Sequence, residues 1–198
     1  MLEEFVNYIQ KIFPSIDPYV QDKTKNAIKL FHKSEDKLCW FNSTPYEYLA
    51  QGDIVDNIPF YNVDKNGNLR VFRTKGILIS NTCSASREET IIFAPLLKIE
   101  SLNLKNLNDI KKNLYYRLMY IPTTKYQDFV IDFSIMSSFN REFINNKIKE
   151  GKIKKEVSLN QMGYYLFIAK LTIWFMRPED SSVQVDRKEN FYNSNVDK

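Results

Sequence analysis

Hydrophobic residues recur at helical spacing along the first part of the chain. Apolar positions three and four apart over residues 2–13 predict an amphipathic helix, which Pro14 would end. A second helix is expected from Pro18 to about Lys37, with apolar residues on an inner face and lysines on the outer face. The chain is therefore expected to begin with two amphipathic helices.

A capping box marks a third, short helix before the strands begin. Thr44-Pro45-Tyr46-Glu47 combines a threonine N-cap, a proline at the first helical position and a glutamate three residues after the cap. Gly52 is well placed to end this helix. We therefore expect residues 1–50 to form a helical extension ahead of the core.

From Asp53 onward the pattern changes to short runs rich in β-branched residues, which is typical of strands. The residues 64–68, Asp-Lys-Asn-Gly-Asn, predict a hairpin turn, because Asn-Gly readily adopts the positive φ angles that such turns need. The polar residues Asn81–Glu89 are expected to form a loop. The strands predicted around these connections are Asp53–Tyr61, Leu69–Ser80 (as one or two strands) and Thr90–Leu97.

The second half of the chain mixes strands and helices. Residues Ser101–Asn113 are expected to form a helix or an irregular insertion. A second hairpin is predicted to turn at Pro122–Lys125, between strands Leu114–Ile121 and Asp128–Ile135. A helix is then expected over Asn140–Lys149.

The end of the chain carries one more helix signal. Ser158-Leu159-Asn160-Gln161 is a further capping box, and it opens an aromatic-rich helix that Pro178 would end. These elements predict an α+β fold, a mostly antiparallel sheet of five or six strands rolled into a barrel. The expected division is a helical extension over 1–50, a β-barrel core with a helical insertion over 51–157, a C-terminal helix packed on the core over 158–180 and a flexible tail over 181–198.

Composition agrees with one folded domain that carries a mild, uneven positive charge. The 198 residues are 43% hydrophobic and 14% aromatic, which is enough for a sizeable core. The net charge is +4, and residues 101–156 hold eleven Lys or Arg against six Asp or Glu. This segment is the first candidate for contact with phosphate, and the alternative is a solvated lysine-rich face.

Cysteine usage and hydropathy exclude several other classes of protein. Cys39 and Cys83 are the only cysteines and form no Cys-x-x-Cys pair, so neither a disulfide framework nor a cysteine zinc site is expected. The acidic start of the chain is unlike a signal peptide. The apolar stretch Met162–Met176 contains Lys170 and is shorter than the roughly 20 residues of a membrane-spanning helix. A soluble, cytoplasmic protein without metal, cofactor or membrane contact is expected.

Three stretches, in order, resemble the PemK/MazF-type toxins: Gly52-Asp53-Ile54, Leu78-Ile79-Ser80-Asn81 and Ile92-Phe93-Ala94-Pro95-Leu96. Ser134–Ser138 followed by Arg141-Glu142-Phe143 is similar to that family's later strand and helix. The resemblance covers residues 51–148. It implies a small antiparallel SH3-like β-barrel, here with N- and C-terminal helical extensions, and a dimeric endoribonuclease that acts on single-stranded RNA.

The chain departs from this family where the resemblance implies catalysis. Thr74 stands at the position of the arginine before the second strand, although Arg73 and Lys75 flank it. Leu97 stands at the position of the threonine after the Ala-Pro strand, and the later strand Val130–Ser134 contains no arginine. A second likeness, to uncharacterised bacterial proteins with a Ser/Asn-x-Cys turn and a final aromatic helix before Arg-Pro, implies architecture only.

Several side chains remain as candidates for chemistry or binding. Cys83 is a possible nucleophile, but His32, the only histidine, is far away in sequence. The carboxylates of Asp53, Asp56 and Asp132 would serve acid–base or magnesium chemistry only if two of them converged. The alternative for all of these residues is an ordinary structural role.

The returning strand of the first hairpin offers a candidate nucleic-acid site. Arg70, Arg73 and Lys75 lie on this strand, with Phe72 between Arg70 and Arg73, and Arg73 and Lys75 share one face. Arg87 is the third expected phosphate contact. The alternative is an edge strand protected by charges. The aromatic residues Tyr164, Tyr165, Phe167, Trp174 and Phe175 are expected in the core or at a dimer face.

Three hypotheses for function follow. The first is a non-catalytic or degenerate PemK/MazF-like protein that binds single-stranded RNA or a partner encoded nearby, in a toxin–antitoxin or phage-defence locus. The second is a metal-independent endoribonuclease, for which Arg73, Ser80, Thr82 and Cys83 are the catalytic candidates. The third is a structural adaptor whose terminal helices dock on a neighbouring protein. A homodimer is compatible with each of them.

Overall fold

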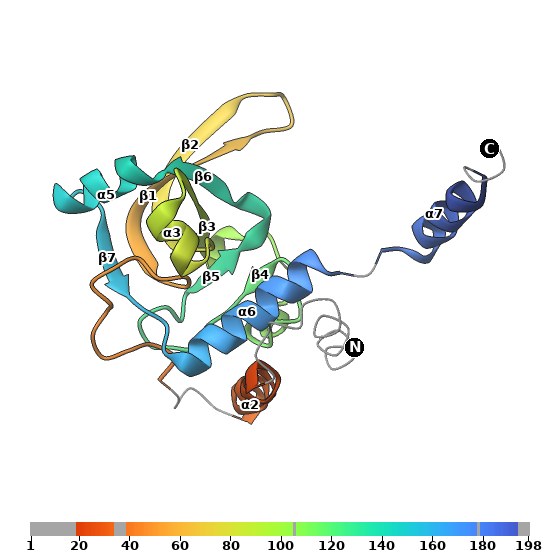
Figure 1. Ribbon diagram of the computed structural model, residues 1–198, viewed down its shortest axis with the longest axis horizontal. Coiled ribbons are helices and arrows are strands. Elements are labelled where there is room, and N and C mark those ends of the chain that lie inside the picture. The colour runs from red at the N-terminus through yellow and green to blue at the C-terminus, as the bar shows by residue number, and fades with distance from the viewer. Residues whose placement is uncertain (1–18, 34–38, 105, 178, 194–198) are drawn as a thin grey trace.

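The computed structural model describes residues 19–33, 39–104, 106–177 and 179–193, and the helix expected over residues 2–13 lies outside them. A seven-stranded antiparallel sheet lies among helices, which confirms the α+β class (Figure 1). The strands are β1 (Ile54–Val63), β2 (Leu69–Leu78), β3 (Thr90–Lys98), β4 (Leu118–Met119), β5 (Phe129–Asp132), β6 (Ser137–Asn140) and β7 (Lys154–Val157). The helices are α2 (Tyr19–Lys33), α3 (Thr82–Arg87), α4 (Leu107–Lys111), α5 (Arg141–Lys149), α6 (Gln161–Phe175) and α7 (Ser181–Asn193).

Strand β3 is the centre of the sheet. The hydrogen-bonded order is β4-β5-β3-β2-β1-β7, and β6 also pairs with β3. The first half of β3 pairs with β6 and its last residues pair with β5, while β2 pairs along Phe93–Pro95. Within the described residues, the path ends at β4 and β7, so the curved sheet is not closed into a ring.

Both predicted hairpins form. β1 and β2 are antiparallel neighbours, and the turn between them is held by Asp64, whose side chain accepts hydrogen bonds from the backbone N–H groups of Asn66 and Asn68. Gly67 has a φ of +82°, the left-handed conformation that glycine adopts without strain. β4 and β5 form the second hairpin, with Leu118 opposite Asp132.

Residues 44–52 do not form the short helix that the capping box predicts. Phe41 forms an isolated bridge with Leu159, and the backbone N–H of Tyr46 donates to Ser158 Oγ at 3.0 Å. The segment is therefore held in a non-helical course by the chain just before α6. Local capping chemistry is outweighed here by these long-range partners.

Two further local predictions are wrong, and both concern helix starts. The expected loop Asn81–Glu89 contains helix α3, because Asn81 accepts from the N–H of Cys83 and caps it. The N-cap of α6 is Asn160, whose side chain accepts from Gly163 N–H, whereas Ser158 bonds Tyr46 instead.

The predicted helix over Asn140–Lys149 is confirmed as α5, with Asn140 as its cap.

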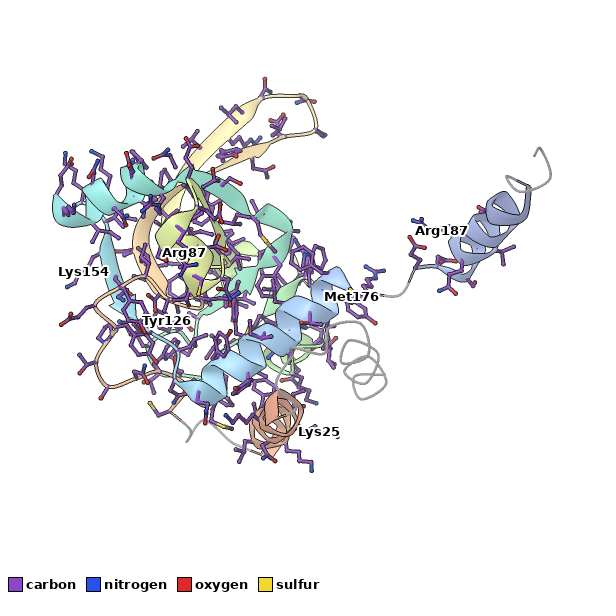
Figure 2. All side chains as sticks on the ribbon, in the orientation of Figure 1. Lys25, Arg87, Tyr126, Lys154, Met176 and Arg187 are labelled. Atoms are coloured by element: carbon purple, nitrogen blue, oxygen red, sulfur yellow. The ribbon has the colours of Figure 1, made fainter. Side chains whose placement is uncertain are left out.

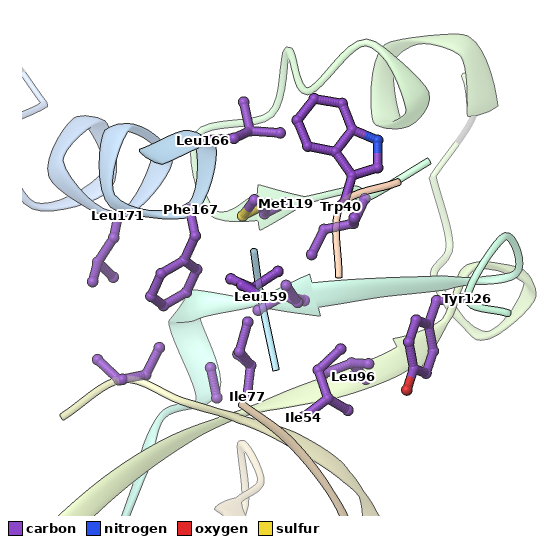
Figure 3. Packing of buried hydrophobic residues seen from close by; sticks show 14 of the residues in the cluster. Trp40, Ile54, Ile77, Leu96, Met119, Tyr126, Leu159, Leu166, Phe167 and Leu171 are labelled. Carbon is purple, nitrogen blue, oxygen red and sulfur yellow. The ribbon is translucent and has the colours of Figure 1, made fainter. Parts of the chain in front are cut away.

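The main core lies between one side of the sheet and helices α2 and α6. Figure 3 shows Phe167 and Leu171 of α6 pointing toward the strands, and Leu166 on the side of the helix where Trp40 lies. Gly163 permits this packing, since a Cβ there would lie 2.3 Å from the carbonyl oxygen of Trp40. On α2, Ala27 is fully buried, whereas Leu30, which the pattern places inward, is exposed.

A second core lies against the other side of the sheet. It contains fully buried residues of β1, β2 and β3 together with Ile144 of α5. A small third cluster joins β4, β5 and α4 around Ile110 and Leu118. Of the aromatic residues of α6, Phe167 is buried and Phe175 is exposed.

The residues expected as a flexible tail form helix α7 over Ser181–Asn193. In Figure 1 this helix lies apart from the sheet, beyond the end of α6. Val183 and Val185 on it are both exposed.

Candidate functional site

The β1–β2 hairpin extends beyond the rest of the sheet (Figure 1). β7 pairs with β1 only over Ile54–Asp56, and β3 pairs with β2 only over Gly76–Leu78. Among the described residues, the ribbon from Ile58 to Thr74 therefore has no neighbouring strand on either edge. Edges of this kind offer unpaired backbone N–H and C=O groups to another chain.

One face of this ribbon is apolar and open to solvent. Tyr61 lies opposite Val71, and Val63 lies opposite Leu69, so the four side chains share a face. Their exposed fractions are 46% for Tyr61, 59% for Val63, 64% for Leu69 and 66% for Val71. We call these four residues the outer hairpin face. A contiguous exposed apolar patch is a recognised mark of an interaction site.

The opposite face of the ribbon anchors it to the body of the protein. Phe60 is fully buried and stacks on Phe72 with ring centroids 5.9 Å apart. Nearer the turn, Arg70 pairs with Asp64 at 3.2 Å. The apolar side chains of the inner face are thus packed together, whereas those of the outer hairpin face are exposed.

Arg73 lies at the base of the outer hairpin face, since it is two residues from Val71 on the same strand. Its guanidinium Nη1 donates to the carbonyl oxygen of Asn57 at 3.1 Å. Asn57 has a φ of 62° and sits in the irregular part of β1, where the register with β2 shifts. Arg73 is exposed and forms no ion pair within the described residues.

Lys75, the second predicted phosphate contact, is neutralised by two carboxylates. Its Nζ lies 2.6 Å from Glu156 Oε1 and 3.4 Å from Asp56 Oδ1. Glu156 also accepts a hydrogen bond from Tyr126 Oη at 2.7 Å and pairs with Lys125 at 3.4 Å. This network joins β1, β2, β7 and the loop between β4 and β5.

The protonation states in this network follow from burial and pairing. Burial alone would raise the pKa of Glu156, but hydrogen bonds from Lys75 and Tyr126 outweigh it and hold the pKa below its usual value. Burial would lower the pKa of Lys75, and its pairing with Glu156 raises that pKa instead. Burial and then Glu156 raise the pKa of Tyr126, which keeps the phenol protonated as a donor. These shifts favour a charged Glu156, a charged Lys75 and a neutral Tyr126.

The two hydroxyl candidates have local structural roles, and the thiol candidate is exposed. Ser80 Oγ accepts from Ile92 N–H at 2.9 Å, and Thr82 Oγ1 accepts from Gln51 N–H at 3.0 Å. Cys83 is exposed near the start of α3. In the part of the chain that the structure describes, none of the three bonds a carboxylate, lysine or arginine side chain. Their catalytic roles stay predictions.

Arg87 is the last residue of α3 and is exposed; Figure 2 labels it on that helix. It lies on a different element from Arg73 and Lys75. The side chain of His32 lies outside what the structure describes, so a pairing with Cys83 stays a hypothesis.

The three carboxylates singled out from the sequence have separate partners. Asp53 is buried, and its Oδ2 accepts from Ala50 N–H at 2.8 Å and from Lys155 Nζ at 3.1 Å. Asp132 is also buried, and its Oδ2 lies 2.7 Å from Arg117 Nη1. Asp56 pairs with Lys75. No group of three or more potential metal ligands occurs among the described residues.

Sequence reasoning missed two features of this region. Glu156 lies 81 positions from Lys75 and 30 from Tyr126, and no local pattern connects them. The outer hairpin face had a signal in the sequence, since Tyr61 and Val63 alternate with polar positions across the turn from Leu69 and Val71. Alternation does not indicate which face of a strand is covered, however, so the exposed face was not predicted.

Within the described part of the chain, no helix is both long enough and apolar enough to cross a membrane.

No protein-family model and no curated protein matches the chain. Among solved structures, the chain is similar to the crystal structure of MazE-MazF (Form-II) from Deinococcus radiodurans. The match has a TM-score of 0.39 and 10% sequence identity, and it covers 67% of this chain and 100% of that chain. A likeness of this size is a distant one of fold, and it carries no argument about activity or partners.

Proposed function

We propose that this chain is a non-catalytic binding protein that recognises an extended, acidic segment of a partner protein along the outer hairpin face. The observation that carries the proposal is the set of four exposed apolar side chains on a ribbon that extends from the body of the protein. Because these side chains are about half to two thirds exposed, covering each of them would contribute roughly 1–2 kcal/mol before the costs of association.

The unpaired edge of β2 favours an extended partner. A partner strand that adds to this edge would satisfy backbone N–H and C=O groups, and its alternate side chains would reach the outer hairpin face. β1 contains Pro59, which lacks an N–H, so we expect the edge of β2 rather than that of β1 to receive the strand.

Arg73 favours an acidic residue in the partner. Its charge is not neutralised by an ion pair within the described residues, and it lies beside the apolar residues of the same face. A partner carboxylate next to the guanidinium would form a charge-assisted hydrogen bond. The partner segment is thus expected to combine apolar residues with at least one acidic residue.

Single-stranded RNA is the less favoured ligand. Base stacking uses aromatic rings, and the outer hairpin face has Tyr61 as its one aromatic residue. Lys75, the expected second phosphate contact, already faces two carboxylates. The family resemblance found in the sequence makes a protein encoded nearby, in a cytoplasmic toxin–antitoxin or phage-defence system, the first partner to test.

The proposal is tested with the full chain and the purified products of the adjacent genes. Titration calorimetry should detect a complex, and the double variant L69E/V71E should weaken it at least tenfold, since two buried apolar contacts are lost and carboxylates face the partner's acidic residue. The matched control V183E/V185E places the same two charges on α7 and should bind like the native chain.

Two further measurements separate protein binding from the alternatives. Arg73→Ala should weaken the same complex and reduce its salt dependence. Unchanged binding by L69E/V71E would contradict the proposal. Salt-dependent binding of single-stranded RNA that R73A and K75A weaken, or cleavage of transcripts by the purified chain, would replace it with a nucleic-acid function.

A further inference from the structure

A cavity of about 270 Å³ lies between α2, α6 and the segment 112–116. This volume corresponds to about nine water molecules at ~30 Å³ each, so a small organic molecule fits. Its wall is largely apolar, with side chains from two helices and one connecting segment. Among the described residues that form it are Ile28 and Phe31 of α2, Leu114 and Tyr116, and Leu166 and Ile173 of α6.

Lys170 is the buried cation of this cavity. It lines the wall, and the residue is only 7% exposed. Its Nζ donates to the carbonyl oxygens of Asn113 and Tyr115, each at 2.7 Å, which uses two of the three ammonium N–H groups. Within the described part of the chain, no carboxylate pairs with it.

A buried ammonium group without a counter-charge is unfavourable. Carbonyl oxygens satisfy hydrogen bonds but do not neutralise the charge. Burial accordingly lowers the pKa of Lys170 to about 8. A carboxylate in the cavity would supply the missing charge and accept the third N–H.

We propose that this cavity binds a small carboxylate with an apolar tail, whose carboxylate meets Lys170 and whose tail covers the apolar wall between α2 and α6. Lys112, which also lines the cavity, adds a second positive charge. The cavity involves none of the residues of the outer hairpin face. This binding site is therefore independent of the proposed function.

Octanoate is the probe for this proposal, and octan-1-ol, which has the same tail and no charge, is its control. Titration calorimetry on the full chain should give octanoate an affinity at least about tenfold above that of octan-1-ol, because only octanoate pairs with Lys170. Lys170→Met keeps an unbranched apolar side chain and should remove this preference. Ala169→Leu, which narrows the cavity and keeps the lysine, should weaken both ligands.

A measurement on the native chain covers the case in which Lys170→Met does not fold. NMR of the Lys170 side-chain nitrogen should show its pKa rising when octanoate is added, and octanoate affinity should fall as the pH rises above about 8. Lys112, Tyr116 and the backbone carbonyls of Asn113 and Tyr115 are the other charged, titratable or polar groups facing the site among the described residues. Equal affinity for the two probes, no saturable binding at millimolar octanoate, or an unchanged Lys170 pKa would each overturn the proposal.

Discussion

Glu156 links distant parts of the chain through one carboxylate. Each of its two oxygens has a short contact, Oε1 with Lys75 at 2.6 Å and Oε2 with Tyr126 at 2.7 Å. The side chain is largely buried, so these contacts are poorly screened by solvent. Glu156 thereby connects the base of the β1–β2 hairpin to the β4–β5 loop.

Replacing Glu156 with Gln should destabilise the protein at neutral pH by about 1–3 kcal/mol, because hydrogen bonds to a charged group are lost. The folded-state pKa of Glu156 is lowered, so its contribution is complete above the unfolded pKa of about 4.3 and is lost as the pH falls through the folded value. Urea unfolding of both proteins should show a difference at pH 7 that shrinks as the pH is lowered below about 4.3.

Glu100→Gln is the matched control, since Glu100 is exposed and has a single ion pair with Lys98 at 3.3 Å. We expect it to change the unfolding free energy by less than about 0.5 kcal/mol. Equal effects of E156Q and E100Q would contradict the structural role given to the buried carboxylate.

The sequence predicts the backbone position of these residues better than their partners. Alternation places Arg73 and Lys75 on one face of a strand, in agreement with the structure. The two residues differ in their partners, because Lys75 pairs with Glu156 of β7, which is distant in sequence. Such a partner depends on how β7 aligns with β1, and local spacing carries no information about that alignment.

Among the helices, α5 depends on a single capping side chain. Asn140 Oδ1 accepts from the N–H of Phe143 at 3.1 Å, which satisfies one of the free amide groups of the first turn. Asn140→Ala should lower the unfolding free energy by about 1 kcal/mol, and Asn140→Asp should largely preserve it. Chemical denaturation of the three proteins measures this. An alanine variant as stable as the native chain would show that the Asn140 cap does not stabilise α5.

Helix α6 depends on the absence of a side chain at Gly163. A Cβ at this position would lie 2.3 Å from Trp40 O and 2.9 Å from Leu159 Cδ2, so the helix or the Trp40 segment must shift. Gly163→Ala should therefore destabilise the protein by about 1–3 kcal/mol, despite the higher helix propensity of alanine.

Gln161→Ala, at an exposed position in the same helical turn, is the control for Gly163→Ala and should change stability little. Thermal unfolding of the two variants tests the difference. If Gly163→Ala is stabilising, as helix propensity alone predicts, then α6 does not approach Trp40 as closely as described.

At the level of elements, the sequence predicts the long, periodic segments well. The existence of α2, α5, α6 and both hairpins follows from periodicity and turn residues. Errors occur where two local signals compete. Ser158 and Asn160 are both good N-cap residues. The Ser158 hydroxyl accepts a hydrogen bond from Tyr46 N–H, and Asn160 caps α6. A contact between distant segments therefore decides where α6 begins.

For the whole molecule, the outer hairpin face should be dispensable for folding. Leu69 and Val71 are 64% and 66% exposed, so Leu69→Thr and Val71→Thr together should change the unfolding free energy by less than about 0.5 kcal/mol. Size-exclusion chromatography and thermal unfolding measure this. A large loss of stability would mean that another part of the chain, or a second copy, covers the face.

The α+β class and the approximate strand positions could be predicted from the sequence, since hydrophobic runs and turn residues define them. The open path of the sheet could not, because closure depends on the long-range pairing of β4 and β7. The cavity around Lys170 was also not foreseen. The sequence shows a lysine inside an apolar stretch, and only the packing of α2 and the segment 112–116 on α6 makes it a cavity residue.

Strand β3 has hydrogen-bonded partners on both edges, with β2 on one side and β6 and β5 in succession on the other. None of these three strands can separate without exposing polar backbone groups of β3. We therefore expect the amides of Ile91–Ala94, Leu96 and Leu97 to exchange with deuterium only through global opening of the molecule, whereas amides at the hairpin tip exchange through local fluctuations. Strand β3, which contributes no residue to either proposed site, would then be the last strand to open.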